Sequence, residues 1–303
     1  MTKSAPGPRP VPVSTPARQL AASLEPIAGQ AQFSPECHTA YEALGFGPSS
    51  GAVGTTSLPD RSAYFTARGS ILGQVPGTVV AAAFGVFNPD VVVPLVTEGW
   101  QRTDAATIWA ARQSGAVAQL RRLSGPEPTA AGRIADLLLR AAEPLPLVGR
   151  ALFAGARSKE LPDEPVARLW RAADLLREYR GDSHIIAWAA EGLDPVEIGL
   201  LGDLYWGLVL RAHTGGRGWS TDQLAAGEDR LRSRGLLDGG ALSPAGFAVR
   251  DRIEALTDEL VAPALTVLGD HFDDVVSTLR PWGDAIIAGG GYLSPAVRFT
   301  FTR

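Results

Sequence analysis

The chain of 303 residues has a single cysteine, Cys37. One thiol closes no intramolecular disulfide, which excludes a fold held together by such bonds. The four histidines, at positions 38, 184, 213 and 271, show none of the spacings of a structural zinc site. We therefore expect a protein of a reducing compartment, the cytoplasm, with no metal.

The sequence also lacks an excess of positive charge and any long apolar run. Lys+Arg 28 against Asp+Glu 32 give a formal net charge of −4. Binding to phosphates depends on clustered Lys and Arg that displace counterions, so contact with DNA would require a local basic patch. No apolar run approaches the roughly 20 residues that cross a bilayer, so no membrane association is expected.

The first eighteen residues contain five prolines among small and polar residues. Such a composition buries too little apolar surface to fold, and it lacks the apolar block of a signal peptide. We expect a disordered Pro-rich tail over residues 1–19.

Residues that start and end helices are frequent in the remaining chain. Apolar spacing predicts helices over roughly 89–99, 103–123 and 129–142, and a Gly/Ser/Thr-rich loop over 47–59. A helix that starts near residue 166 is expected to stop near Gly181, with Asp182 capping the next one. At the C-terminus Val297, Phe299 and Phe301 alternate with polar residues, which favours an edge strand. We expect a helical N-terminal domain at 20–145, a linker at 146–165, a second domain at 166–270, and a C-terminal helix and edge strand at 271–303.

The second domain carries the clearest signals. Asp194-Pro195-Val196-Glu197 supplies a cap, a first-turn proline and a carboxylate at the third helical position. Another helix opens at Ser220-Thr221 and runs to Arg234, and a long helix opens at Ser243-Pro244. Between them Asp238-Gly239-Gly240 is turn chemistry between two short apolar strands.

Residues 194–260 resemble the winged helix-turn-helix of the MarR class. The resemblance rests on Leu231-x-x-x-Gly235-Leu236 and on Leu242-Ser243-x-x-Gly246. It implies a mainly α fold: a helical N-terminal domain plus a winged helix-turn-helix domain with a short β-hairpin wing. It also implies a homodimer, because MarR-like scaffolds bury their terminal helices against a partner.

The whole chain is similar to an actinobacterial family of SalK-type winged-helix proteins. The similarity rests on three segments, Tyr64-Phe65-x-x-Arg68 with Leu72-Gly73, Leu175-Leu176-Arg177-Glu178-x-Arg180-Gly181-Asp182-x-His184, and Arg217-Gly218-Trp219-Ser220.

Reading of DNA by this module is the alternative function. A recognition helix enters the major groove through its N-terminal residues, and cations around it bind phosphates. Here the helix has no cation before Arg230, and Arg217 to Glu254 holds six arginines against six acids. The expected wing is short and lacks the arginine that MarR-type wings insert into the minor groove. Gln223, Arg230 and Arg232 are the candidate DNA-binding residues.

Tyr64, Phe65 and Arg68 form a first candidate ligand site. Tyr64 and Arg68 lie four apart on a helix and so project side by side. A phenol beside a guanidinium suits a carboxylate, phenolate or enolate. A salt bridge from Arg68 to an acid of the second domain is the alternative.

His184 marks a second candidate site, with Arg180 nearby and Trp188 on the same helix face. An imidazole beside an aromatic wall suits a general base, a hydrogen-bond donor to a carbonyl or a haem ligand. A histidine bound to a backbone carbonyl is the alternative. Trp170, Trp188 and Trp206 are candidates for the walls of a ligand cavity, or for ordinary core residues.

Other motifs carry less. Cys37 and His38 are adjacent, about 100° apart on a helix, so neither activates the other. Gly289-Gly290-Gly291 lacks the context of a phosphate loop, and no dinucleotide fingerprint is present, so no cofactor is expected. The hypothesis is a small-molecule-binding winged-helix protein of bacterial specialised metabolism, with a pocket between its two domains. Such a pocket with Tyr64, Arg68 and His184 would also serve a cofactor-independent enzyme of proton transfer or cyclisation. A ligand-responsive MarR-type transcriptional regulator is the alternative.

Overall fold

The computed structural model describes residues 15–125 and 128–293 and is mainly helical, with two small antiparallel hairpins. The helices are α1 Pro16–Gly29, α2 Pro35–Glu42, α3 Arg61–Gly69, α4 Gly77–Phe84, α5 Pro89–Arg102, α6 Ala105–Ser124, α7 Ala131–Ala142, α8 Ala151–Arg157, α9 Pro165–Ala190, α10 Pro195–Tyr205, α11 Thr221–Ser233, α12 Pro244–Leu268 and α13 Phe272–Ala288. Short 3-10 turns are η1 Gln30–Gln32, η2 Ser70–Leu72, η3 Thr214–Arg217 and η4 Gly269–His271. The hairpins pair β1 Gly51–Val53 with β2 Thr56–Leu58, and β3 Leu237–Asp238 with β4 Ala241–Leu242.

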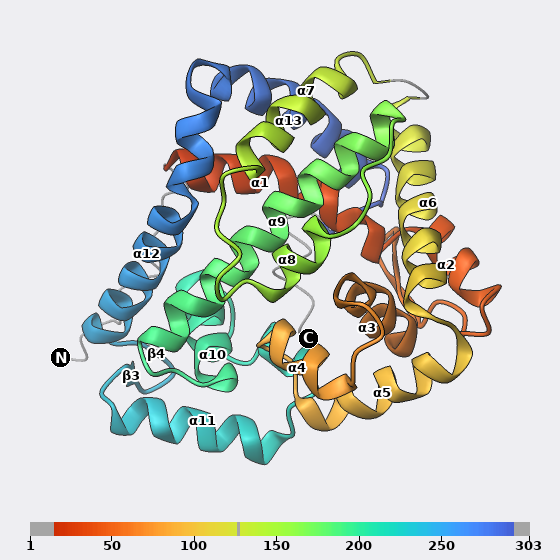
Figure 1. Cartoon of the computed structure of the whole chain (residues 1–303). Helices are drawn as coiled ribbons and strands as arrows, with labels where there is room; N and C mark the ends of the chain where they lie inside the picture. Colours follow the sequence, from red (N-terminus) through yellow and green to blue (C-terminus); the bar gives the residue numbers. More distant parts are fainter. Residues whose placement is uncertain (1–14, 126–127, 294–303) are drawn as a thin grey trace.

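The long helix α9 is the centre of the molecule. It contacts α1, α6, α7, α8 and α12, and Figure 1 shows it running between α6 on one side and α12 on the other. Buried residues lie on every face of α9, including the fully buried Trp170 and Arg171. A helix surrounded in this way gains most of its stability from packing rather than from intrinsic propensity.

Three clusters of buried side chains fill the interior. The largest joins α1, α6, α7, α9, α12 and α13, so helices from both ends of the chain share it. A second joins the end of α9 with α10, α11, β3, β4 and α12. A third lies between α3, α4 and α5.

The predicted break at Gly181 is wrong, because α9 continues to Ala190. A glycine inside a helix costs about 1 kcal/mol relative to alanine, which the packing of α9 on its neighbours offsets. Asp182 caps a different helix from the one expected: its Oδ2 accepts a hydrogen bond from the backbone N–H of Phe153, in the first turn of α8, at 2.9 Å.

Other boundaries also differ from the sequence prediction. Helix α1 begins at Pro16, within the predicted tail, because Thr15 caps it and Leu20 and Leu24 are buried. The predicted loop over 47–59 holds the β1–β2 hairpin, whose strands are too short to show a period. The 146–165 segment contains α8. Residues 1–14 of the predicted tail and Val297, Phe299 and Phe301 of the predicted edge strand lie outside the described residues.

The segment from α10 to α12 follows its caps. Asp194 and Ser220 each form a capping box at the start of α10 and α11, and Ser243 caps α12. The β3–β4 hairpin turns at Gly239, whose φ of 60° favours glycine. The order of helix, hairpin and helix over 221–268 thus agrees with the sequence prediction. The connection between α10 and α11 spans residues 206–220, whereas helix-turn-helix turns have three or four residues.

Candidate functional site

Arg68 of α3 forms the salt bridge that was the alternative to a ligand contact. Its Nη2 and Nε lie 2.8 and 3.3 Å from the two carboxylate oxygens of Glu178 on α9. Arg177 donates to the same carboxylate at 2.9 Å and to Glu25 of α1 at 3.0 Å. Burial alone would raise the pKa of Glu178, but the guanidinium groups of Arg68 and Arg177 outweigh it and lower the pKa to about 2. These charges join α1, α3 and α9.

Arg217, at the end of η3, approaches the same region from the connection between α10 and α11. Its guanidinium lies 4.4 Å from the centre of the Phe87 ring, and Tyr64 packs on that ring at 6.0 Å. Its Nη2 is 3.2 Å from His213 Nε2. Among residues 15–125 and 128–293, no carboxylate lies within ion-pair distance of Arg217. Burial lowers its pKa, and the nearby charges of Arg68 and Arg177 act in the same direction, whereas Tyr64 and the carboxylate of Asp203 oppose them.

Three segments that are far apart in the sequence therefore meet at one place. We call Arg68, Arg177 and Arg217, with Tyr64 and Glu178, the central arginine cluster. It contains three cations and one carboxylate, and α3, α9 and η3 position them. Phe65, the neighbour of Tyr64, is buried behind it, 5.0 Å from Tyr64 and from Phe87 between ring centres.

His184 and Arg180 lie further along α9 and face α12. His184 Nδ1 is 3.1 Å from the hydroxyl of Thr257, which donates its own proton to the carbonyl of Ile253. Nδ1 must then carry the hydrogen, and burial together with the charges of Arg250 and Arg180 lowers the pKa of His184 well below its usual value. The imidazole is neutral at pH 7. Its partner is thus a side-chain hydroxyl and not the backbone carbonyl of the alternative interpretation.

The structure brings together some of the predicted site residues and separates others. A cavity of about 140 Å³ between α1 and α9 is lined by Arg68, Arg177, Arg180 and Glu178, among others. Tyr64, His184 and the tryptophans do not line it. Arg180 also lies 3.6 Å from Glu254 of α12.

The three candidate tryptophans occupy three different environments. Trp170 is fully buried and donates its indole N–H to the carbonyl of Ala28 at 3.3 Å. Trp188 is buried in the core that joins α9 to α10 and α11. Trp206 is 38% exposed and packs on Tyr205. They do not form the walls of one cavity.

The arginines of α11 are paired with acids of the same chain. Arg230 contacts Asp194 and Glu197, and Arg232 contacts Glu228 and Asp229. These arginine side chains are 46% and 42% exposed, and such surface pairs contribute only about 0–1 kcal/mol. The pairs neutralise the charge of the two arginines but hold their side chains only weakly.

The N-terminal end of α11 is held by the connection between α4 and α5. The Asn88 side chain donates to the carbonyl of Gly218 at 3.0 Å and to Oε1 of Gln223 at 3.3 Å. Trp219 donates its indole N–H to the carbonyl of Val86 at 3.1 Å. Figure 1 shows α11 and α5 following one another, end to end, along the lower edge of the molecule. Gln223, a candidate base-reading residue, is therefore engaged by its own chain.

Arg177, Glu178 and Arg217 were not chosen as site residues from the sequence, although all three lie in the segments that carry the SalK-type resemblance. No spacing relates α3, α9 and η3 to one another, so only the folded chain shows that they meet. Within the described ranges no group of three or more His, Cys, Asp or Glu side chains is placed to hold a metal ion. Over the same ranges no helix has the length and apolar character to cross a membrane.

A model of a helix-turn-helix family matches residues 17–293. No curated protein and no solved structure matches the chain. Since the matched range covers nearly the whole sequence, the chain belongs to this helix-turn-helix family.

Proposed function

We propose that this helix-turn-helix protein binds a small organic anion at the central arginine cluster. The observation that carries the proposal is Arg217, a half-buried cation that rests on an aromatic ring beside Tyr64 with no carboxylate partner in the described part of the chain. A buried charge is costly unless it is paired. A carboxylate or enolate from outside would supply the missing partner.

The surroundings suit such a ligand. A guanidinium presents planar donors that match a carboxylate, and hydrogen bonds between charged groups are stronger than neutral ones. Tyr64 adds a phenol, and Phe87 an apolar wall. Within the cluster only Glu178 opposes an anion, and Arg68 and Arg177 already neutralise it. The adjoining cavity of about 140 Å³ is the size of a few water molecules, at about 30 Å³ each, so a compact acid fits the site better than a large one.

The test uses acetate, pyruvate and benzoate, each at 10 mM, against sodium chloride at matched ionic strength. We expect at least one acid to raise the melting temperature of the protein, because a ligand that binds only the folded state stabilises it. Arg217→Gln should abolish the effect. Arg122→Gln, which changes an exposed arginine paired with Glu36, should preserve it. The proposal fails if none of the acids stabilises the protein, or if Arg217→Gln responds as the wild type does.

A DNA-binding regulator is the second candidate, and the family match favours it. The hairpin and long helix after α11 resemble the wing arrangement of the MarR class, which supports the same candidate. The paired arginines of α11, the fifteen-residue connection before it and the contacts of Gln223 with Asn88 oppose it. A gel shift with upstream DNA between 50 and 200 mM salt decides: regulators lose affinity steeply with salt, and Arg232→Ala should reduce the slope by about 1.

A further inference from the structure

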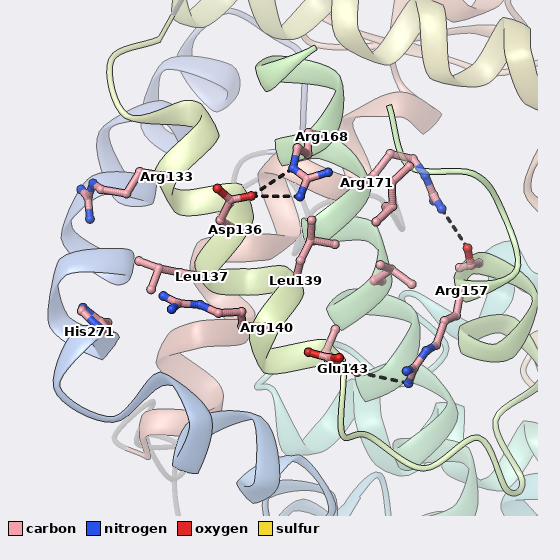
Figure 2. A pocket seen from close by; sticks show the side chains of 14 residues that line it. Arg133, Asp136, Leu137, Leu139, Arg140, Glu143, Arg157, Arg168, Arg171 and His271 are labelled. Atoms are coloured by element: carbon pink, nitrogen blue, oxygen red, sulfur yellow. Dashed lines mark hydrogen bonds and ion pairs between the residues drawn. The ribbon is translucent and has the colours of Figure 1, made fainter. Parts of the chain in front are cut away.

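A second cationic site shares no residue with the central arginine cluster. It is a hollow of about 1000 Å³ formed by α7, α8, α9 and His271 of η4. We call it the α7–α9 hollow. Its charged lining residues are Arg133, Arg140, Arg157, Arg168, Arg171 and His271 on the positive side, and Asp136 and Glu143 on the negative side. Figure 2 shows Arg133, Arg140 and His271 on one side and Arg157 and Arg171 on the other.

Two of the five arginines are already compensated. Arg168 lies 3.0 Å from Asp136, a contact visible in Figure 2, and Arg133 pairs with Asp274 of α13. Arg157 donates only to the backbone carbonyls of Ala142 and Leu145, at 3.5 and 3.3 Å. Within 15–125 and 128–293 neither Arg157 nor the exposed Arg140 has an acidic partner. The hollow therefore keeps a positive excess.

Arg171 is the strongest sign of a missing anion. The side chain is fully buried, and its Nη2 donates to the carbonyl of Ala156 at 2.8 Å. Its Nε and Nη1 have no hydrogen-bond partner in the described structure. Its Nη1 lies 4.0 Å from Asp174, which already accepts two hydrogen bonds from Arg112, and its guanidinium lies 4.7 Å from the centre of the Trp109 ring, which accepts none of its N–H groups in a hydrogen bond. Native proteins seldom leave buried donors unpaired.

Apolar side chains complete the hollow. Leu137, Leu139, Leu161 and Leu175 contribute to its lining, and Leu161 is 40% exposed. Pockets of 300–1,000 Å³ that combine apolar walls with a few polar anchors are typical of small-molecule sites. We propose that the α7–α9 hollow binds an amphipathic organic acid, with its carboxylate at Arg157 and Arg171 and its apolar body on the leucines.

Titration calorimetry with decanoate, below its micelle concentration, tests the proposal, with decanol as the neutral analogue. Decanoate should bind and decanol should bind at least tenfold more weakly, because a hydrogen bond to a charged group is lost. Arg157→Gln should weaken decanoate binding by tenfold or more, because Arg157 is the exposed partner of the carboxylate. Arg122→Gln should leave it unchanged. Arg217→Gln should also leave it unchanged, which separates this site from the central arginine cluster.

Arg171→Met removes the buried guanidinium and should also weaken decanoate binding, provided that far-UV circular dichroism shows the variant to be folded. If that variant does not fold, the exposed Arg157→Gln variant decides the matter alone. Decanol binding as tightly as decanoate, or decanoate binding by Arg157→Gln within twofold of the wild type, overturns the proposal. Absence of any decanoate binding by the wild type overturns it as well.

Discussion

Replacement of Glu178 by glutamine is the sharpest perturbation that the central arginine cluster allows. The carboxylate is fully buried and accepts hydrogen bonds from both Arg68 and Arg177. The Glu178→Gln side chain would keep the shape but leave two guanidinium groups facing an uncharged amide. Removal of one partner from a buried ion pair costs about 3–5 kcal/mol. The low end applies here, since Arg177 keeps its contact with Glu25 and the Arg68 side chain is 13% exposed.

The pKa of Glu178 gives an independent figure for the same loss. A decrease from 4.5 to about 2 corresponds to about 3 kcal/mol at pH 7, at 1.36 kcal/mol for each pKa unit. Because the folded-state pKa is the lower one, this stability is complete above pH 4.5 and is lost as the pH falls toward 2. For 303 residues, about 3 kcal/mol is a decrease of about 5 °C in melting temperature.

The assay is scanning calorimetry of wild type, Glu178→Gln, and the control Glu36→Gln, at pH 7 and pH 3. Glu36 pairs with Arg122 near the surface, so its loss should cost less than about 1 kcal/mol. The difference in melting temperature between wild type and Glu178→Gln should be smaller at pH 3 than at pH 7. The double variant Arg68→Gln with Glu178→Gln should lose less than the sum of the two single changes. A loss of under about 1 kcal/mol for Glu178→Gln at pH 7 would refute the reasoning.

Three further predictions concern other parts of the fold. Burial raises the pKa of Asp182 from 3.8 to about 7, although the hydrogen bond from the Phe153 backbone N–H acts in the opposite direction. Ionisation of Asp182 should therefore lower the free energy of unfolding as the pH rises from 4 to 7, by up to about 4 kcal/mol. Asp182→Asn should make the free energy of unfolding, measured in urea, less dependent on pH. Gly246→Ala would bring a methyl group within 2.2 Å of the Leu236 carbonyl and should destabilise the chain by about 1–3 kcal/mol in thermal melts, whereas Gly240→Ala meets open space and should not. Cys37 is buried, and burial raises its pKa to about 11, so it should resist a thiol reagent until the protein is unfolded in urea; rapid labelling of the native protein would contradict this.

The sequence predicted the start of a helix well where the side chain that caps the helix directly precedes it. Asp194, Ser220 and Ser243 each cap the helix that follows them, so those starts were readable from the sequence. Gly181 was misleading because the helix that contains it is held by neighbours distant in sequence. The strands of the β1–β2 hairpin have three residues each, which is too short for the sequence to show the alternation of apolar and polar residues.

The candidate site was only partly predictable, for a related reason. The sequence singled out Tyr64 and Arg68, and it offered an acid of the second half as the partner of Arg68, which is Glu178. It gave no ground for placing Arg217 beside them, because that contact depends on where η3 packs. The α7–α9 hollow was missed altogether: its arginines come from three helices, and Arg171 occupies a buried position of α9 that the apolar stripe does not mark.

The continuity of α9 has a mechanical consequence. At 1.5 Å per residue its 26 residues form a rod about 39 Å long. Arg171 of the hollow, Arg177 of the central cluster and Trp188 of the core behind α11 are rigidly attached to it at successive levels. A small rotation or tilt of this helix moves all three residues together. A displacement of α9 at the hollow would therefore also change the packing at the central arginine cluster and at the core behind α11.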